Sequence, residues 1–478
     1  MGDEPGFAYT VALTNAIAAA TAALLRDSPD AFRYRGADLR SAVERSLYIE
    51  LVSHPGLVHA YAAGGAAPPL GSGIAANTAA ALLGRSRRKP RLDTRALAAR
   101  GLFAARSVAD RVSGRGPSRY GEASGPACFV VGQPKYLRFI APIRERMERP
   151  TRVLATFVSD DIDDEIDLDS GGDLRARAVG RALWGFPSLM HGYDQLVELL
   201  SRARASRAVA VEGMSPLDEL CAQAARALGI PSVCIQQGWS PLVHAGFRRM
   251  THSTMTVWGE GFRELLEPHN PGVGFAVTGN PVLGDELSSV RLREEIGDRS
   301  GVAFFLQSTS AWIGEDHLHA LHELAARVGA DLPDTAVLVR EHPSAPLSEA
   351  ERQAISASPN VRFAPAEEFA LREVLDAADL AVSIYSTSLL EGAALGTPAV
   401  IFNPMSLPPL EPDLAALGAA ERVGGVEEAL AAIRAILHDD ERRKRMHAAG
   451  AVVRERYFAG GHGADAARRT AETIEGHG

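Results

Sequence analysis

From residue 127 to the end of the chain, short apolar runs alternate with longer segments in which apolar residues recur every three or four positions. The short runs are rich in valine, isoleucine and phenylalanine and end at glycine, proline or polar residues, which favours buried strands. Strands that alternate with amphipathic helices build a parallel sheet. The predicted strands cover residues 127–131, 152–158, 208–211, 232–235, 253–258, 275–278, 302–306, 336–339, 361–363, 380–384 and 399–402.

These strands form two series, which predicts two Rossmann-like α/β domains, each a doubly wound parallel sheet, that face one cleft. The first domain is expected at residues 125–290 and the second at 298–460, followed by a C-terminal helix at 461–478. Residues 1–120 are rich in alanine, arginine and leucine at helical spacing, so they are predicted to form a helical N-terminal region.

Composition and charge narrow the class of protein. With 478 residues, 46% of them hydrophobic and 23% charged, the chain is typical of a globular protein rather than a disordered or fibrous one. A formal net charge of −9 argues against a nucleic-acid binder. Cys128, Cys221 and Cys234 are odd in number and widely spaced, which predicts reduced core residues rather than disulfides or structural zinc.

Two segments bear on contact with a membrane. The apolar stretch 11–25 is interrupted by polar residues, and we expect it to be too short to span a bilayer. The basic run at 85–89 is more typical of a solvated linker than of a polyanion or membrane contact. We therefore expect a cytoplasmic protein, whose residues 1–120 could make a peripheral contact with the inner face of the membrane or with an assembly complex.

Several predicted strands end in polar clusters. The clusters are Gln307-Ser308-Thr309, Arg340-Glu341-His342-Pro343 and Tyr385-Ser386-Thr387-Ser388. The carboxyl edge of a parallel sheet is where ligands bind, because helix N-termini and loop amides converge there. The sequence therefore predicts a binding site on the second domain.

The order of the motifs carries a resemblance. CIQQGW, VTGNP, FFLQSTS, LVREHPS and VSIYSTSLLEGAALGTPAVIF follow one another between residues 234 and 402, and RYFAGGHGADAARR follows at 456–469. This order resembles the GT-B glycosyltransferase superfamily, over residues 127–474. Within it, the chain is similar to bacterial surface-polysaccharide transferases with an HP motif, including Kdo and sialic acid transferases and CDP-glycerol polymerases. UDP-N-acetylglucosamine 2-epimerases share a similar fold and motif order.

Physical reasons support a nucleotide site in the second domain. Arg340 and His342 lie two residues apart on one face of a strand end, where both can donate to a phosphate, and Pro343 fixes the backbone. Ser386, Thr387 and Ser388 precede a helix predicted at 389–395, whose unpaired amides favour an anion. Gln307, Ser308 and Thr309 are predicted to contact the base or a phosphate. A solvated turn and an ordinary helix cap are the alternatives.

The resemblance also implies a role for Glu391, which is placed on the first turn of that helix. In GT-B enzymes a glutamate of an EG pair binds the ribose hydroxyls, and Gly392 is expected to leave room for the ligand. The alternative is an acid that only stabilises the helix dipole. An HP motif beside hydroxyl residues suits a CMP-linked donor, whereas the EG pair suits a UDP- or GDP-linked donor.

Carboxylates of the first domain are candidates for a general base. Asp160 and Asp161 follow its second strand, and Glu212 follows its third. An inverting transfer needs such a group to deprotonate the acceptor hydroxyl. Asp-x-Asp patterns at 161–163 and 167–169 mimic metal sites, but those belong to a different glycosyltransferase fold, so we predict no catalytic metal. Trp239 and Trp258 are expected to pack rather than to stack on sugar.

The sequence thus predicts a metal-independent GT-B glycosyltransferase without a cofactor. It would move a sugar or sugar acid from a nucleotide donor to a surface polysaccharide, a glycolipid or a related acceptor, which places it in capsule or cell-envelope biosynthesis. One alternative is an enzyme similar to UDP-N-acetylglucosamine 2-epimerase, which needs no acceptor. Another is a non-catalytic scaffold in polysaccharide assembly.

Overall fold

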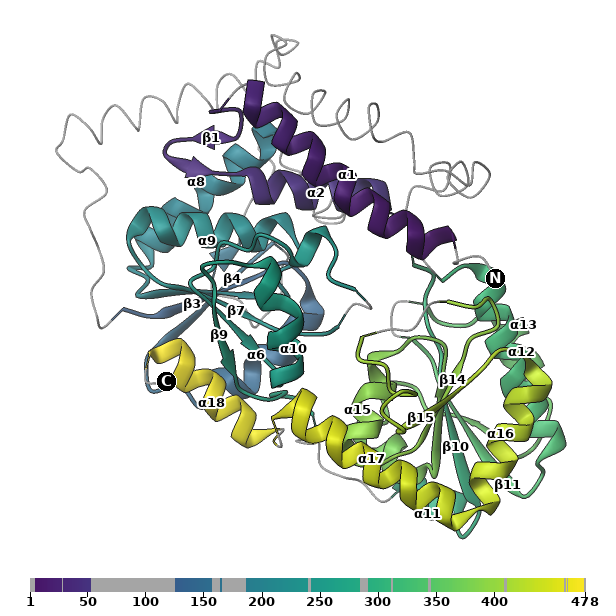
Figure 1. The fold of residues 1–478 in the computed structure, drawn as a ribbon. Coiled ribbons are helices and arrows are strands. Elements are labelled where there is room, and N and C mark those ends of the chain that lie inside the picture. Colours follow the sequence, from purple (N-terminus) through teal and green to yellow (C-terminus); the bar gives the residue numbers. More distant parts are fainter. Residues whose placement is uncertain are drawn as a thin grey trace, which may run out of the picture.

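Two parallel β-sheets with helices packed around them form the body of the molecule (Figure 1). The computed structural model describes residues 5–27, 29–52, 125–156, 164–165, 186–239, 242–283, 291–310, 313–342, 345–407, 411–459, 461 and 463–476. The basic run 85–89 and the acidic residues Asp160 and Asp161 lie outside the described residues.

The first sheet has seven strands in the order β5-β4-β3-β6-β7-β8-β9, and all neighbouring strands are parallel. Its strands are β3 Ala127–Val131, β4 Thr151–Ala155, β5 Asp164–Glu165, β6 Arg207–Val211, β7 Ser232–Ile235, β8 Thr254–Val257 and β9 Gly274–Val277. The helices around it are α6 Leu137–Arg144, α8 Phe186–Arg202, α9 Pro216–Leu228 and α10 Glu260–Leu266, with short 3-10 helices η2 Pro134–Tyr136, η3 Ala245–Phe247 and η4 Glu267–His269.

The second sheet has six parallel strands in the order β12-β11-β10-β13-β14-β15. The strands are β10 Ser300–Phe305, β11 Thr335–Arg340, β12 Val361–Phe363, β13 Leu380–Ser383, β14 Ala399–Phe402 and β15 Ala420–Val423. Its helices are α11 Arg291–Ile296, α12 Glu315–Asp331, α13 Glu349–Ile355, α14 Leu371–Ala377, α15 Thr387–Leu395, α16 Val426–His438 and α17 Asp440–Phe458.

Both sheets bury both faces, as the apolar runs predict. Along β3, Cys128 and Val130 belong to one apolar cluster, whereas Phe129 and Val131 belong to the cluster on the opposite face. Successive side chains of a strand point to opposite faces, so a strand covered on both sides needs an unbroken apolar run. All three cysteines are buried and free, as predicted.

Each predicted strand is present, with small differences at the ends, and the two parallel sheets contain two further strands among the described residues, β5 and β15. β15 contains Glu421 and Arg422 and lies at the sheet edge, so it lacks the continuous apolar run by which buried strands are recognised. β5 has only two residues, both acidic. Edge strands need fewer apolar residues, which is why the sequence pattern missed them.

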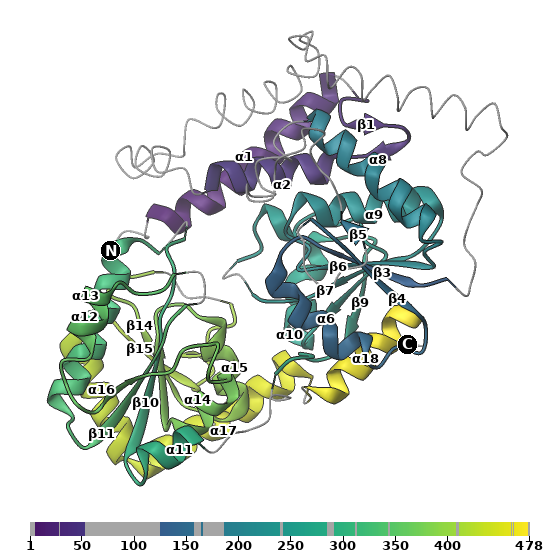
Figure 2. The same ribbon diagram turned by 180° about the vertical axis from the view of Figure 1, so that it is seen from behind.

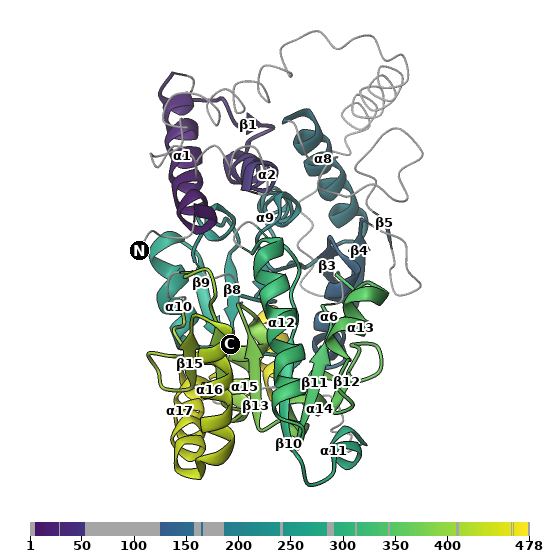
Figure 3. The same ribbon diagram turned by 90° about the vertical axis from the view of Figure 1, so that its right-hand side faces the viewer.

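The helical N-terminal region packs on the first domain. It consists of α1 Pro5–Asp27, a two-stranded hairpin of β1 Arg33–Tyr34 and β2 Ala37–Asp38, and α2 Arg40–Val52. α2 lies against α8, α9 and η3, and Figure 3 shows α1 and α2 above the sheet domains. The region shares one apolar core with β3, β6 and α9.

α1 is longer than the apolar stretch 11–25 discussed above. Residues Ala8–Arg26 have a mean hydropathy of 1.5, and by length and composition they could cross a membrane. The expectation that this stretch is too short is therefore wrong, because the helix extends beyond it at both ends. Tyr9, Leu13 and Ile17 on one side of α1 are buried in the protein core, and 33% of the stretch Ala8–Arg26 is buried.

The chain returns to the first domain at its end. α18 Ala464–Glu475 packs against α6, side by side in Figure 2, and its Ala467, Ala471 and Ile474 join the core beneath the first sheet. Just before it, Tyr457 and Phe458 contact aromatic rings of the first domain. The last two helices therefore join the two domains.

A buried ion pair connects the N-terminal region to the first sheet. Arg45 of α2 is 0% exposed and lies 3.1 Å from a carboxylate oxygen of Glu219 in α9. Its Nε also donates to the carbonyl oxygen of Gly213 at 3.0 Å. A guanidinium in the interior is stable only when such partners replace its water.

Arg45→Met should lower the free energy of unfolding by about 3–5 kcal/mol, because Glu219 would keep a buried charge without its cation. Urea unfolding followed by circular dichroism measures the loss. Arg372→Met is the matched control, since Arg372 pairs with Asp376 on the helix surface and should change the midpoint little. A loss below about 1 kcal/mol for Arg45→Met would show that the pair contributes no more than a surface pair.

Candidate functional site

The carboxyl ends of β10, β11 and β13 lie next to one another and bring together the predicted polar clusters of the second domain. Gln307 follows β10, Arg340 is the last residue of β11, and Ser386 follows β13. Ser308 and Thr309 continue from Gln307; Ser308 is half-buried and Thr309 is exposed. Pro343 lies outside the described residues.

Gln307 bonds to the protein backbone, and its contact with a ligand stays a prediction. Its Oε1 accepts hydrogen bonds from the Tyr385 backbone nitrogen at 2.7 Å and the Ser383 hydroxyl at 3.3 Å, and its Nε2 donates to the Tyr385 carbonyl. The amide thus clamps the end of β13 to the end of β10. Gln307 positions the start of α15 through the backbone of Tyr385.

The N-terminus of α15 begins earlier than predicted. Ser386 is the N-cap, and its hydroxyl accepts a hydrogen bond from the Ser388 nitrogen at 3.2 Å, so Thr387 and Ser388 form the first turn. The helix starts at Thr387 because this cap replaces one of the missing intrahelical bonds. The remaining backbone amides and the helix dipole favour an anion there.

Glu391 is the fifth residue of α15, at the start of the second turn rather than on the first. Its Oε1 accepts a hydrogen bond from Asn280 Nδ2 at 3.2 Å, across the boundary between the two domains. A carboxylate has about four acceptor positions, and a diol is a ligand from which it can accept. Its position at the domain boundary rules out the helix dipole as its only partner.

Gly392 serves packing rather than ligand approach. A β-carbon at this position would lie 3.0 Å from Leu375 Cδ2 of α14, so the neighbouring helix occupies the space. The expectation that Gly392 leaves room for a ligand is therefore wrong. Gly396 ends α15 with φ +97°, a left-handed conformation that returns the chain to β14.

Arg340 is the last residue of β11, and His342 follows it closely in the chain. The Arg340 Nη1 donates to the carbonyl oxygen of Phe369 at 2.5 Å. His342 is partly buried, and burial lowers its pKa, with a further lowering by the positive charge of Lys135. His342 is therefore neutral near pH 7, and a neutral imidazole can still donate one N–H to a phosphate.

Lys135 belongs to the first domain and is exposed on the loop between β3 and α6. Its charge acts on His342 of the second domain and also on Glu212 of the first. Lys135 of the first domain therefore lies near enough to the second domain for its charge to act on His342, and both side chains can donate to an anionic ligand. Lys135 lies in the segment GQPKY, and the action of its charge on His342 depends on how the domains pack.

Glu212 occupies a strained corner after β6. Its backbone has φ +85°, and Gly213 follows with φ +80°. A left-handed conformation is uncommon for a glutamate and persists only where the surroundings enforce it. A β-carbon on Gly213 would lie 2.4 Å from Met250 Cε, so only glycine fits the second position.

The carboxylate of Glu212 is held by Tyr136, whose hydroxyl donates to Oε2. Burial raises the pKa of Glu212, while Lys135 and the Tyr136 hydrogen bond lower it in part. Burial and the neighbouring Glu212 charge also raise the pKa of Tyr136, which stays a donor. A carboxylate with raised pKa is a stronger base, which suits proton removal from a hydroxyl.

Both tryptophans pack, as expected. Trp258 is 1% exposed, its ring stacks on Phe458 with centroids 5.5 Å apart, and its Nε1 donates to the Gln236 carbonyl. Trp239 packs on Phe262, and its Nε1 donates to the carbonyl of Glu411 in the second domain. Trp239 also lines a pocket.

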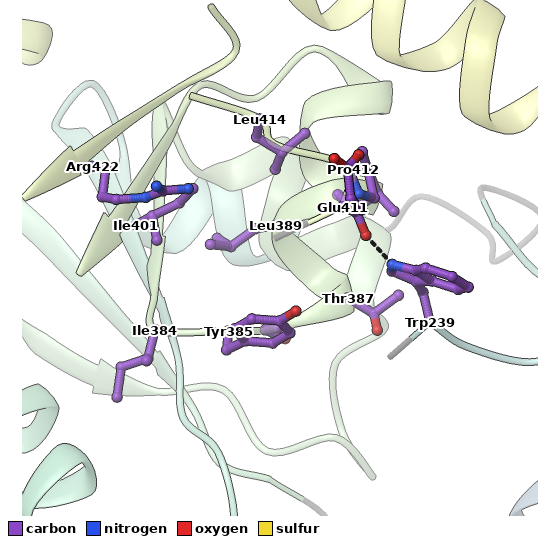
Figure 4. A pocket seen from close by; sticks show the side chains of 12 residues that line it. Trp239, Ile384, Tyr385, Thr387, Leu389, Ile401, Glu411, Pro412, Leu414 and Arg422 are labelled. Atoms are coloured by element: carbon purple, nitrogen blue, oxygen red, sulfur yellow. Dashed lines mark hydrogen bonds between the residues drawn. The ribbon is translucent and has the colours of Figure 1, made fainter. Parts of the chain in front are cut away.

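That pocket opens beside the N-terminus of α15, at the carboxyl ends of β13 and β14 (Figure 4). Its residues come from the second domain, apart from Trp239, which contacts it from the first. The lining comprises Trp239, Ile384, Tyr385, Ser386, Thr387, Leu389, Leu390, Ile401, Glu411, Pro412, Leu414 and Arg422. Arg422 lies on β15, the strand that the sequence pattern missed, whereas Tyr385, Ser386 and Thr387 belong to a polar cluster that the sequence predicts at this edge.

Within the described residues, no group of three or more histidine, cysteine, aspartate or glutamate side chains is placed to hold a metal ion. The acidic segment that contains Asp160, Asp161 and both Asp-x-Asp patterns lies outside these residues, apart from Asp164 and Glu165. The absence of a catalytic metal stays a prediction.

Comparisons with known proteins bear on the fold. No protein-family model matches the sequence, and no curated protein matches it. Among solved structures, the S. aureus MnaA–UDP structure has a TM-score of 0.55 at 13% identity, over 74% of this chain and 96% of that chain. UDP-GlcNAc 2-epimerase from Neisseria meningitidis bound to UDP-GlcNAc has a TM-score of 0.54 at 15% identity, over 73% and 99%.

UDP-GlcNAc 2-epimerase from Methanocaldococcus jannaschii, in complex with UDP-GlcNAc and UDP, matches with a TM-score of 0.50 at 13% identity, over 74% of this chain and all of that chain. The identities are low, so the likeness concerns the fold. The fold is GT-B, with two Rossmann-like domains, as the motif order predicts.

Lys135→Met should raise the pKa of His342, because the variant removes a positive charge that opposes protonation of the imidazole. NMR titration of the His342 ring proton measures the change. Lys444→Met is the control, since Lys444 is exposed on α17 and pairs with Glu441. An unchanged pKa of His342 in Lys135→Met would show that the two residues do not face each other in solution.

Proposed function

We propose that this chain is a metal-independent GT-B glycosyltransferase, which moves a sugar or sugar acid from a nucleotide donor to a glycan or lipid-linked acceptor. The observation that carries the proposal is a set of three side chains, Lys135 and Glu212 of the first domain and His342 of the second, in which the charge of Lys135 acts on both of the others. It combines two donors for a leaving phosphate with a carboxylate that can act as a base.

The donor is proposed to bind the second domain. Glu391 would accept hydrogen bonds from the ribose, and the N-terminus of α15 with Arg340 and His342 would hold the phosphates. The donors would stabilise the negative charge that develops on the phosphate oxygen as its bond to the sugar breaks. No acidic side chain is needed to hold a metal in this arrangement.

The acceptor would approach from the first domain. In an inverting transfer Glu212 would take the proton of the acceptor hydroxyl while the acceptor oxygen forms its bond to the sugar carbon. Asp160 and Asp161 remain alternative candidates for this base. The N-terminal region supports the assignment, because Arg45 contacts the carbonyl of Gly213 next to Glu212.

A UDP-N-acetylglucosamine 2-epimerase is the second candidate, since the structural neighbours include enzymes of that name. One difference favours the transferase. The neighbours cover about three quarters of this chain but nearly all of their own length, so this chain carries an additional part. Residues 1–120 account for about the quarter of the chain that the neighbours do not cover. The described part of this region packs on the first domain, which is the proposed acceptor side, and an epimerase needs no acceptor.

Nucleotide binding tests the proposal against a non-catalytic scaffold. CMP, CDP, UDP, GDP and dTDP are added separately, and at least one at a hundred times its dissociation constant should stabilise the protein by about 2.7 kcal/mol in a thermal-shift assay. Incubation with UDP-N-acetylglucosamine alone should leave that sugar unchanged. Appearance of the manno epimer would identify an epimerase, and no shift with any nucleotide would contradict the proposal.

Glu212→Gln should lower the transfer rate by roughly a hundredfold to ten-thousandfold, the usual contribution of a general base. The amide oxygen can still accept from Tyr136, so the nucleotide dissociation constant should stay the same. Asp160→Ala and Asp161→Ala are measured in parallel to identify the base. Near wild-type rates in all three variants would favour a base elsewhere or a retaining mechanism.

A further inference from the structure

The pocket beside α15 has an apolar interior. Ile384, Leu389, Ile401 and Leu414 line it, and the indole of Trp239 contacts it from the first domain (Figure 4). Such a surface gains free energy when it covers an apolar group and offers little to a hydroxyl-rich one. The occupant is therefore expected to carry an apolar part.

One polar group in the pocket has no partner. The hydroxyl of Tyr385 is buried and makes no hydrogen bond to any described residue. Burial raises the pKa of Tyr385 well above its usual value, although the nearby Arg422 opposes this shift, so the phenol stays protonated. A buried donor without an acceptor is costly, and an oxygen atom of a ligand would satisfy it.

The charges of the pocket favour a neutral acceptor. Arg422 donates to Asp413 Oδ1 at 3.0 Å, and this carboxylate compensates its positive charge. Glu411 adds a negative charge to the lining. An anionic group would meet no excess of positive charge here, whereas a carbonyl oxygen can accept from the Tyr385 hydroxyl.

The position of the pocket relates it to the donor. Ser386 and Thr387 belong both to the pocket lining and to the N-terminus of α15. A phosphate held by that terminus would therefore bring the attached sugar to the pocket mouth. A short neutral substituent of the sugar could enter the pocket.

We propose that the pocket binds the acyl group of an acylated amino sugar, with its carbonyl oxygen at the Tyr385 hydroxyl and its alkyl part against Ile384, Leu389 and Ile401. This inference rests on the proposed function, because it takes the sugar to be linked to a nucleotide at α15. It assigns the specificity of the donor site to Tyr385, a residue outside the predicted nucleotide contacts.

Calorimetric titration with matched donors tests the proposal on the nucleotide that binds most tightly. Each pair compares an acylated donor with a donor that lacks the acyl group. For UDP the pair is UDP-N-acetylglucosamine and UDP-glucose, and for CMP it is CMP-N-acetylneuraminate and CMP-Kdo. For another nucleotide, the pair is the nucleotide linked to an N-acetylated amino sugar and the same nucleotide linked to the free amino sugar. The wild-type protein should bind the acylated donor at least about tenfold more tightly. Equal affinities would overturn the acyl pocket and leave the proposed function standing, whereas failure of every nucleotide to bind would refute that function itself.

Tyr385→Phe removes only the hydroxyl and should weaken binding of the acylated donor about threefold to tenfold, the worth of one hydrogen bond. Its affinity for the free nucleotide should not change. Tyr457→Phe is the matched control, because Tyr457 is a buried tyrosine that packs on Phe262 and does not line the pocket. An equal loss for acylated and non-acylated donors in Tyr385→Phe would show that the hydroxyl does not recognise the acyl group.

Discussion

The first half of the molecule depends on the buried interactions of the Arg45 guanidinium. It lies fully buried between Glu219 and the carbonyl of Gly213, so it joins α2, α9 and the corner after β6. That corner holds Glu212 in a left-handed conformation, which needs support from its surroundings. The N-terminal region is thus part of the first domain's core, and its contact reaches the backbone beside a candidate base.

Asn280 is the residue that connects the two domains, as Arg45 connects the N-terminal region to the first domain. Its side chain donates to Glu391 of α15, its Oδ1 accepts from the Val282 nitrogen, and its carbonyl accepts from the nitrogen of Gly463 before α18. Tyr457 and Phe458, which shortly precede Gly463 in the chain, pack on aromatic rings of the first domain. The approach of Lys135 to His342, and of Trp239 to the pocket, depends on this domain arrangement.

The sequence predicts the positions of the site residues that follow strands. It does not predict the role of a residue whose side chain bonds or packs within the protein. The positions of Arg340, His342 and Ser386 follow from the parallel sheet, because strand ends meet at one edge. Gln307 was placed at the same edge, but its amide bonds to the Tyr385 backbone. Gly392 shows the same limit, since the space beside it belongs to Leu375.

The sequence by itself determined the two parallel sheets, since strands buried on both faces need continuous apolar runs. It also determined the polar residues at their carboxyl ends and the motif order of the GT-B fold. Only the tertiary structure decided that the charge of Lys135 acts on His342, that Tyr136 holds Glu212, and that Tyr385 and Arg422 share a pocket. These contacts join residues from different sheets or strands, and the periodicity of a single segment carries no information about its distant neighbours.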